Sequence, residues 1–206
     1  MSPRFQSLKR GAPRVHQSKR FVSVWLGVFC LCSAISVHAA DVTSIADDGS
    51  SGTLRVEIEA ANATTGISTI DVAVGSDQTI QLITDPLVVP PRDLPIGITQ
   101  PLVIDASSST GLTLTRLLTS GDSFSLSADT TFKNVASFTH GGIAISSGVN
   151  LRLEQTTQAG EVQSSISGSG SLTKEGAGTL TLSGKNSWAG GTTVSEGDLV
   201  IATGDS

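Results

Sequence analysis

Three short segments in which apolar and polar residues alternate follow one another near the end of the sequence, at residues 180–182, 192–194 and 199–201. The glycines between them are Gly184, Gly190, Gly191 and Gly197. Alternation with a period of two between glycine turns predicts β-strands, and strands that are so short and so regularly interrupted predict a solenoid. A solenoid coil buries its inward residues only where another coil stacks on it. We therefore expect neighbouring coils.

Similar segments occur through most of the preceding chain, at residues 68–74, 78–83, 102–104, 112–115, 124–127, 131–135, 143–145 and 151–154. Spacings of about 7 to 12 residues between successive strands predict about 20 to 30 residues for each three-strand coil. The segment from Pro86 to Pro95 is expected to be a loop or an edge, because Pro90 and Pro91 have no N–H to donate to a central ladder. The 22 glycines and the single methionine also fit an all-β chain with many tight turns.

Three phenylalanines fall on this rhythm, Phe124, Phe132 and Phe138. We expect them to point inward and stack in the core, since buried aromatic side chains are the usual case in a β-rich core. A sugar-binding platform on the surface is the alternative.

The residues before the first strand predict a short helix. Asp47, Asp48, Gly49 and Ser50 form a turn cluster, and Ser51 or Thr53 can cap a helix that begins next to it. Leu54, Ile58 and Ala61 are spaced i, i+4 and i+7, so they form one apolar stripe. We expect this helix to cap the first coil of the solenoid. An ordinary surface helix is the alternative.

Residues 1–39 have the pattern of a signal peptide. Six of the 13 basic residues lie in the first 20 positions, and an apolar run from Phe21 to Ile35 follows. Val37 and Ala39 are the small residues that signal peptidase reads, so we place the cut after Ala39, with Ala40 as the alternative. The expected partners are the Sec export machinery and signal peptidase, and an uncleaved anchor is the competing interpretation.

Removal of the leader leaves residues 40–206 as one domain, with seven basic and 18 acidic residues. Nucleic acid is a poor partner for this charge, because phosphate contacts need lysine and arginine. Cys30 and Cys32 leave with the leader, so neither disulfides nor a cysteine-ligated metal is expected. His140 precedes two glycines and is interpreted as a turn residue. We predict no catalytic, cofactor or metal site. Asn62 and Thr64 complete a glycosylation sequon, which is a weak pattern.

The region from about residue 166 to residue 201 closely resembles the autotransporter-associated β-strand repeat. The residues that carry the resemblance are Gly176, Gly178, Leu180, Leu182, Trp188, Gly190, Gly191, Gly197 and Leu199. Residues 48–73 and 94–107 are also similar to the N-terminal segment of large bacterial surface β-helix proteins, except that Glu57 stands where such segments carry a small alanine. The resemblance implies a right-handed parallel β-helix and the passenger of a type V secreted protein.

The family implies a passenger that is carried to the cell surface by a C-terminal outer-membrane barrel. We expect no barrel strands within these 206 residues, because Trp188 is the only aromatic residue after Phe138, and we expect the sequence to be the N-terminal part of a longer protein that has one. The predicted function is that of a structural, adhesin-like segment that is exported from the periplasm to the cell surface or beyond and contacts a host or glycan surface. A polysaccharide-active β-helix enzyme is the alternative.

Overall fold

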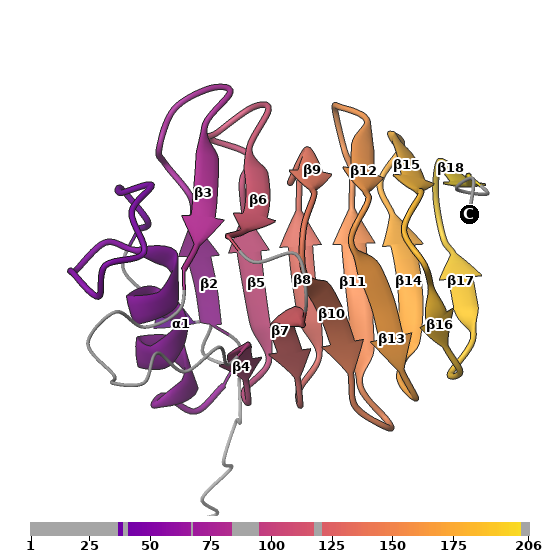
Figure 1. The fold of residues 1–206 in the computed structure, drawn as a ribbon, viewed down its shortest axis with the longest axis horizontal. Helices are drawn as coiled ribbons and strands as arrows, with labels where there is room; N and C mark the ends of the chain where they lie inside the picture. The colour runs from indigo at the N-terminus through magenta and orange to yellow at the C-terminus, as the bar shows by residue number, and fades with distance from the viewer. Residues whose placement is uncertain (1–36, 39–40, 67, 84–94, 118–120, 203–206) are drawn as a thin grey trace, which may run out of the picture. The chain divides into compact units, whose positions relative to one another are not determined.

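The computed structural model describes residues 37–38, 41–66, 68–83, 95–117 and 121–202, all of which lie in one compact unit, Ser33–Ser206. Its strands form three parallel sheets, which run side by side along the solenoid (Figure 1). The seven-stranded sheet contains β1 (Val37–His38), β2 (Ser68–Asp71), β5 (Leu102–Asp105), β8 (Thr130–Lys133), β11 (Asn150–Glu154), β14 (Ser171–Glu175) and β17 (Thr192–Val194). The five-stranded sheet contains β4 (Ile96–Ile98), β7 (Asp122–Leu126), β10 (Gly142–Ile145), β13 (Ser165–Gly168) and β16 (Ser187–Trp188). The six-stranded sheet contains β3 (Thr79–Leu82), β6 (Thr113–Arg116), β9 (Ser137–Phe138), β12 (Gly160–Val162), β15 (Thr179–Leu182) and β18 (Asp198–Ile201).

From β2 onward, each strand pairs with the strand three places further along the chain, so three strands make one coil. The prediction of an all-β, right-handed parallel β-helix is confirmed, and a right-handed path is the one that parallel crossovers take. Leu102, Thr130, Leu151 and Leu172 are aligned in register, which gives coils of 28, 21 and 21 residues. The coil from Ser68 to Leu102 is 34 residues, longer than predicted. It includes the proline-rich stretch, of which residues 86–94 lie outside the described residues.

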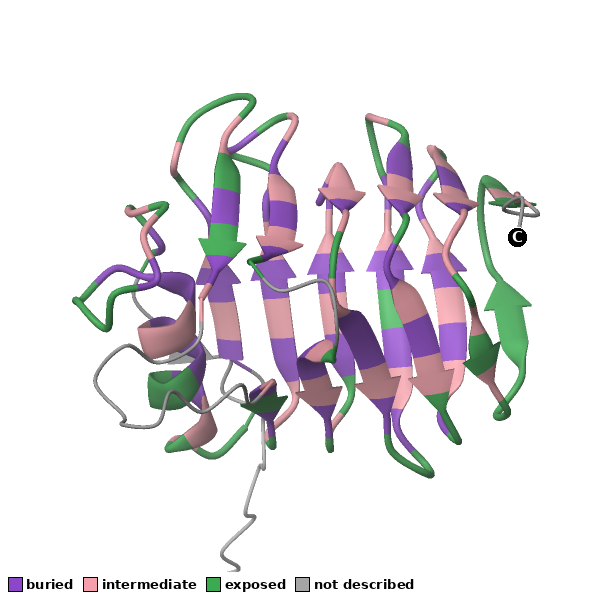
Figure 2. Ribbon diagram, in the orientation of Figure 1, coloured by how far each residue is buried: buried purple, intermediate pink, exposed green. Residues whose placement is uncertain are grey.

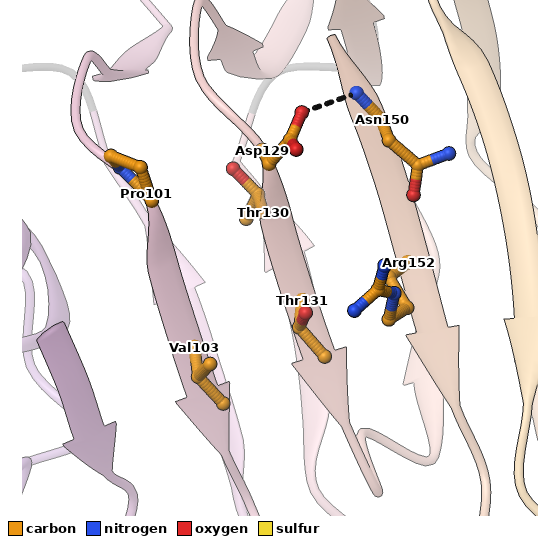
Figure 3. A pocket seen from close by; sticks show the side chains of 7 residues that line it. All are labelled: Pro101, Val103, Asp129, Thr130, Thr131, Asn150 and Arg152. Carbon is orange, nitrogen blue, oxygen red and sulfur yellow. Dashed lines mark hydrogen bonds between the residues drawn. The ribbon is translucent and has the colours of Figure 1, made fainter. Parts of the chain in front are cut away.

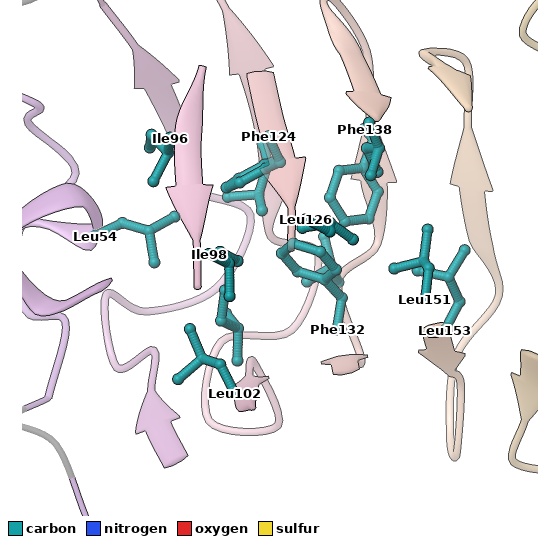
Figure 4. Packing of buried hydrophobic residues seen from close by; sticks show 14 of the residues in the cluster. Leu54, Ile96, Ile98, Leu102, Phe124, Leu126, Phe132, Phe138, Leu151 and Leu153 are labelled. Carbon is teal, nitrogen blue, oxygen red and sulfur yellow. The ribbon is translucent and has the colours of Figure 1, made fainter. Parts of the chain in front are cut away.

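The core lies between the three sheets. Buried and less buried residues alternate along most strands, so that one face of each strand points inward (Figure 2). Phe124, Phe132 and Phe138 are all buried, and successive ring centroids are 5.1 Å apart in edge-to-face geometry. The prediction that these rings stack in the core is confirmed (Figure 4), and a surface role in sugar binding is excluded by their burial.

The predicted capping helix is present as α1 (Leu54–Asn62), which begins after Thr53. Its apolar stripe of Leu54, Ile58 and Ala61 is buried as expected. Glu57 is buried with them, and its Oε1 accepts a hydrogen bond of 3.1 Å from the backbone N–H of Gly52. A carboxylate near a helix N-terminus also interacts favourably with the helix dipole. The glutamate at this position therefore ties the helix to the loop before it.

The side chain of Asn62, at the end of α1, covers the free edge of β4. Its Nδ2 donates to the carbonyl of Gly97 (2.8 Å), and its Oδ1 accepts from the N–H of Thr99 (2.9 Å). These two backbone groups lie on the edge of β4 that does not face β7, because β4 is the terminal strand of its sheet. One amide side chain thus replaces the two hydrogen bonds that another strand would make.

β3 is the terminal strand of the six-stranded sheet, and the residue after it, Ile83, is covered by an ion pair between the helix and the loop before it. Arg55 forms a bidentate pair with Asp47, with distances of 2.8 and 2.7 Å. Asp47 Oδ2 accepts from the N–H of Ile83 (2.8 Å), and Arg55 Nη2 donates to the carbonyl of Ile83 (2.7 Å). Both backbone groups of Ile83 are therefore satisfied although none of the described strands lies beside them.

The first edge of the seven-stranded sheet is covered by the chain that precedes the helix. Val37 and His38 pair with Ser68 and Thr69, and Val42 forms a parallel bridge with Val72. A cut after Ala39 would remove β1 and leave the bridge at Val42. Ala39 and Ala40, together with residues 1–36 of the predicted leader, lie outside the described residues.

Replacing Asn62 with alanine should destabilise the protein by about 1–3 kcal/mol, because it removes two hydrogen bonds to the backbone at the edge of β4, each worth about 0.5–1.5 kcal/mol. The measurement is urea-induced unfolding followed by circular dichroism. The matched control is Glu59→Ala on the exposed face of the same helix, for which we expect a change within about 0.5 kcal/mol. Equal effects of the two substitutions would contradict a capping role for Asn62.

Candidate interaction surfaces

The residues of the predicted repeat lie in the last two coils. Leu180 and Leu182 are buried in β15, and Leu199 of β18, which is aligned with Leu180, packs against the core while partly exposed. Trp188 is in β16, and its Nε1 donates to the carbonyl of Gly191 (3.2 Å) and to Thr192 Oγ1 (3.0 Å). The tryptophan thereby fixes the turn between β16 and β17.

The repeat glycines lie at the turns between these strands. Gly176 and Gly178 connect β14 to β15, Gly190 and Gly191 connect β16 to β17, and Gly197 precedes β18. Gly176 has a φ of +74°, and a Cβ placed there would lie 2.4 Å from the carbonyl oxygen of Gln155 in the preceding coil. Gly197 stacks on Gly176 in the same way. Its φ is +68°, and a Cβ placed on Gly197 would lie 2.5 Å from the carbonyl oxygen of Gly176. The turns before β15 and β18 can approach the preceding coil closely because glycine has no Cβ there.

Lys174 is a buried residue of the repeat that sequence reasoning did not single out. It lies on the inward face of β14 and is 0% exposed. Its Nζ donates to the carbonyl oxygens of Glu175 (2.7 Å), Gly176 (2.5 Å) and Glu196 (3.1 Å), so that it links its own coil to the last one. The alternation of residues 171–175 places Lys174 on the same face as the buried Leu172, which is the signal that could have revealed it.

The last coil has no neighbour on one side among the described residues. Val194 is 47% exposed and Ile201 is 58% exposed, although the residues aligned with them in the preceding coil, Lys174 and Leu182, are buried. A hollow of about 390 Å³ lies at this end, lined by Asn186, Trp188, Thr192, Leu199 and Ile201. Figure 2 shows the change from buried to exposed residues at β17. This end of the solenoid is an apolar surface with unpaired strand edges.

A second hollow, of about 260 Å³, lies on the outward face of the seven-stranded sheet (Figure 3). It is lined by Pro101, Val103, Asp129, Thr130, Thr131, Asn150 and Arg152. Asp129 Oδ1 accepts from the N–H of Asn150 at 2.8 Å, and the Asn150 amide nitrogen donates to Ser171 and Thr173. The polar groups of this hollow are therefore largely used in holding neighbouring coils together.

Ion pairs on this sheet also join neighbouring coils. Lys133 pairs with Asp105 at 3.0 Å, and Arg152 pairs with Glu175 at 3.1 Å. Partial burial acts to raise the pKa of Asp105, but hydrogen bonds from Ser107 and Lys133 outweigh it and lower that pKa. The hydrogen bond to Asp105 raises the pKa of Lys133 against a smaller opposing effect of burial. Opposite charges in adjacent coils thus favour each other's ionised forms.

The imidazole of His140 lies beside threonine hydroxyls. The Nδ1 of His140 lies 3.2 Å from Thr115 Oγ1, a hydroxyl that also accepts a hydrogen bond from Thr139. Within the described ranges, no three side chains of histidine, cysteine, aspartate or glutamate are grouped so that they could hold a metal ion. In that same part of the chain, no helix is both long and apolar enough to span a membrane.

Comparison with known families identifies the last coils. Residues 172–201 match the family model of the passenger-associated-transport-repeat, which is a repeat of autotransporter passengers. The resemblance predicted for residues 166–201 is confirmed over this range. Searches found no curated protein and no solved structure that matches the chain. The matched residues carry a repeat that suggests an autotransporter passenger segment and implies an exported surface or extracellular protein.

Replacing Lys174 with methionine should destabilise the chain by about 2–4 kcal/mol. Methionine keeps an apolar stem of similar length, but three carbonyl oxygens, among them that of the buried Gly176, lose their donor. Urea-induced unfolding measures the effect, and Thr181→Val, on the outward face of the next strand β15, is the control. A loss below about 0.5 kcal/mol for Lys174→Met would show that the ammonium group does not hold the last coil.

The contribution of Lys174 should also depend on pH. Burial lowers its pKa from the ordinary 10.5, while Glu196 and Asp198 act in the opposite direction. Between the lowered value and 10.5 the unfolded chain binds more protons at this site, so the free energy of unfolding rises with pH in that window. Measured at several pH values up to 10.5, the free energy of unfolding of the wild type should increase relative to that of Lys174→Met as the pH rises. If the difference in free energy of unfolding between the wild type and Lys174→Met shrinks as the pH rises, the prediction is contradicted.

Proposed function

We propose that this chain is a structural and interaction segment of an autotransporter passenger, adhesin-like and without a catalytic site of its own. The observation that carries the proposal is the passenger-associated-transport-repeat in the last two coils of a parallel β-helix. A β-helix of this kind serves as a rigid stalk, because each coil is hydrogen-bonded to its neighbours along three sheets.

The outward face of the seven-stranded sheet supports a role in contact with an external surface. Its strands place one side chain each in a row that crosses the coils, namely Thr69, Val103, Thr131, Arg152, Thr173 and Thr193. Rows of short hydroxyl-bearing side chains on a flat, rigid sheet can meet an extended partner without reordering. A host or glycan surface is the partner that we propose for this face.

Export is part of the same proposal. The Sec machinery would carry the chain out of the cytoplasm, signal peptidase would cut after Ala39, and an outer-membrane barrel of the full-length protein would take the passenger to the surface. Expression of the whole chain in a bacterium with two membranes should yield a periplasmic product that begins at Ala40, as measured by mass spectrometry. The variant Ala39→Trp should keep its leader, since the peptidase reads small residues at that position.

Surface delivery is tested on intact cells, and catalysis is tested on the purified protein. The chain joined to an outer-membrane barrel should become accessible to protease added outside intact cells. The purified β-helix should release no reducing ends or unsaturated products from acidic polysaccharides, with or without calcium. Release of such products would favour the polysaccharide-active alternative and overturn the proposed non-catalytic role.

A further inference from the structure

Three neighbouring strands frame the hollow of about 260 Å³ on the outward face of the seven-stranded sheet (Figure 3). Val103 of β5, Thr131 of β8 and Arg152 of β11 are aligned in register and form one side of the frame. The residues two positions earlier form the other side, and they are Pro101, Asp129 and Asn150. Adjacent strands lie about 4.8 Å apart and two residues along a strand span about 6.6 Å, so the frame has room for one small ring. The three strands are hydrogen-bonded on both sides, so they offer no edge to an extended peptide.

The charges at the hollow favour a neutral ligand. Asp129 Oδ1 accepts a hydrogen bond from the N–H of Asn150 at 2.8 Å. The guanidinium of Arg152 pairs through Nε with Glu175 at 3.1 Å. A basic ligand would be repelled by Arg152, whereas an acidic ligand would be repelled by Asp129 and would compete with Glu175 for the guanidinium. A ligand that only donates and accepts hydrogen bonds meets neither penalty.

Some polar groups of the hollow are left over from these contacts. In the part of the chain that the structure describes, the hydroxyl of Thr131 has no hydrogen-bond partner. The side chain of Arg152 is 46% exposed, and a guanidinium carries five N–H donors, more than a pair with one carboxylate uses. Asn150 Oδ1 is buried without a hydrogen-bond partner, and Figure 3 shows it on the Arg152 side of the amide. A buried acceptor without a donor is unfavourable, so a ligand hydroxyl that moves the long arginine side chain aside and reaches this oxygen is stabilised.

We propose that this hollow binds one neutral pyranose residue of a glycan. The proposed ligand rests on the role of this face in contact with an external surface, and it names the class of group that the face recognises. A sugar hydroxyl both donates and accepts, so ring hydroxyls donate to Asn150 Oδ1 and accept from Thr131 and Arg152. The C–H groups of the ring pack on the apolar side of the hollow, formed by Pro101 and Val103.

Two-dimensional NMR of the whole chain, titrated with the methyl glycosides of glucose, galactose and mannose, tests the proposed ligand. At least one of the three should give saturable shifts at the amides of Val103, Thr131 and Arg152, with a dissociation constant on the order of 1 mM, because a shallow hollow covers little of the sugar. The methyl glycosides of glucosamine and galacturonic acid, in their charged forms, should bind about two- to fivefold more weakly than their neutral counterparts. Saturable shifts with none of the three neutral sugars, shifts confined to other residues, or tighter binding of either charged sugar would overturn the proposal.

Two matched variants separate the hollow from the rest of the surface. Thr131→Val keeps the shape of the side chain but removes its hydroxyl, so the best neutral sugar should bind about two- to tenfold more weakly. Thr113→Val, on the outward face of β6 in the six-stranded sheet, should leave that affinity unchanged. Arg152→Gln should also weaken binding, and urea-induced unfolding shows whether each variant is folded. Equal sugar affinities of Thr131→Val and Thr113→Val would overturn the proposal.

Retention of the whole chain on immobilised mucin, a surface rich in glycans, is measured separately and reports on the adhesive role. Retention on mucin without sugar binding at the hollow would overturn the proposed ligand and leave the adhesive role standing. Sugar binding at the hollow without retention would support the ligand and count against the adhesive role.

Discussion

The structure depends on the stacking of one coil on the next. Each strand is short, and its backbone N–H and C=O groups are satisfied only by strands of the adjacent coils. The same stacking places the inward residues in columns, such as Leu102, Leu151 and Leu172 in the seven-stranded sheet. Neither the hydrogen bonds nor the core of one coil is complete without its neighbours, so the ends of the solenoid are where stability and interaction are decided.

The two ends meet this requirement differently. At the N-terminal end, side chains take the place of a strand, with Asn62 on β4 and the pair of Asp47 and Arg55 on the residue after β3. At the other end, Val194 and Ile201 are exposed, and Leu199 and Ile201 line a hollow. Lys174 holds this last coil from beneath, at the cost of burying an ammonium group. The matched repeat thus combines an attachment to the coil below with a face that none of the described residues covers.

Local patterns were sufficient to predict much of this fold. The period-two alternation located most strands, the i, i+4 spacing of Leu54 and Ile58 located the helix, and the phenylalanines were placed correctly in the core. Contacts between residues far apart in the sequence could not be predicted in this way. In the sequence Asn62 belongs to a sequon and to the family-like segment 48–73, and Glu57 departs from the family pattern. The structure uses Asn62 to cover the edge of β4 and Glu57 to hold the loop before the helix. The two-residue strands β9 and β16 have too few residues for alternation to be recognised.

Amide hydrogen exchange, resolved residue by residue, tests most directly the account of one closed end and one open end. The N–H groups of Thr99 and Ile83 have side-chain acceptors in place of a strand, so we predict protection comparable to that of the central strands β8 and β11. Strands β17 and β18 should exchange much faster. Rapid exchange at Thr99 and Ile83, or equal protection of β18 and the central strands, would contradict the account.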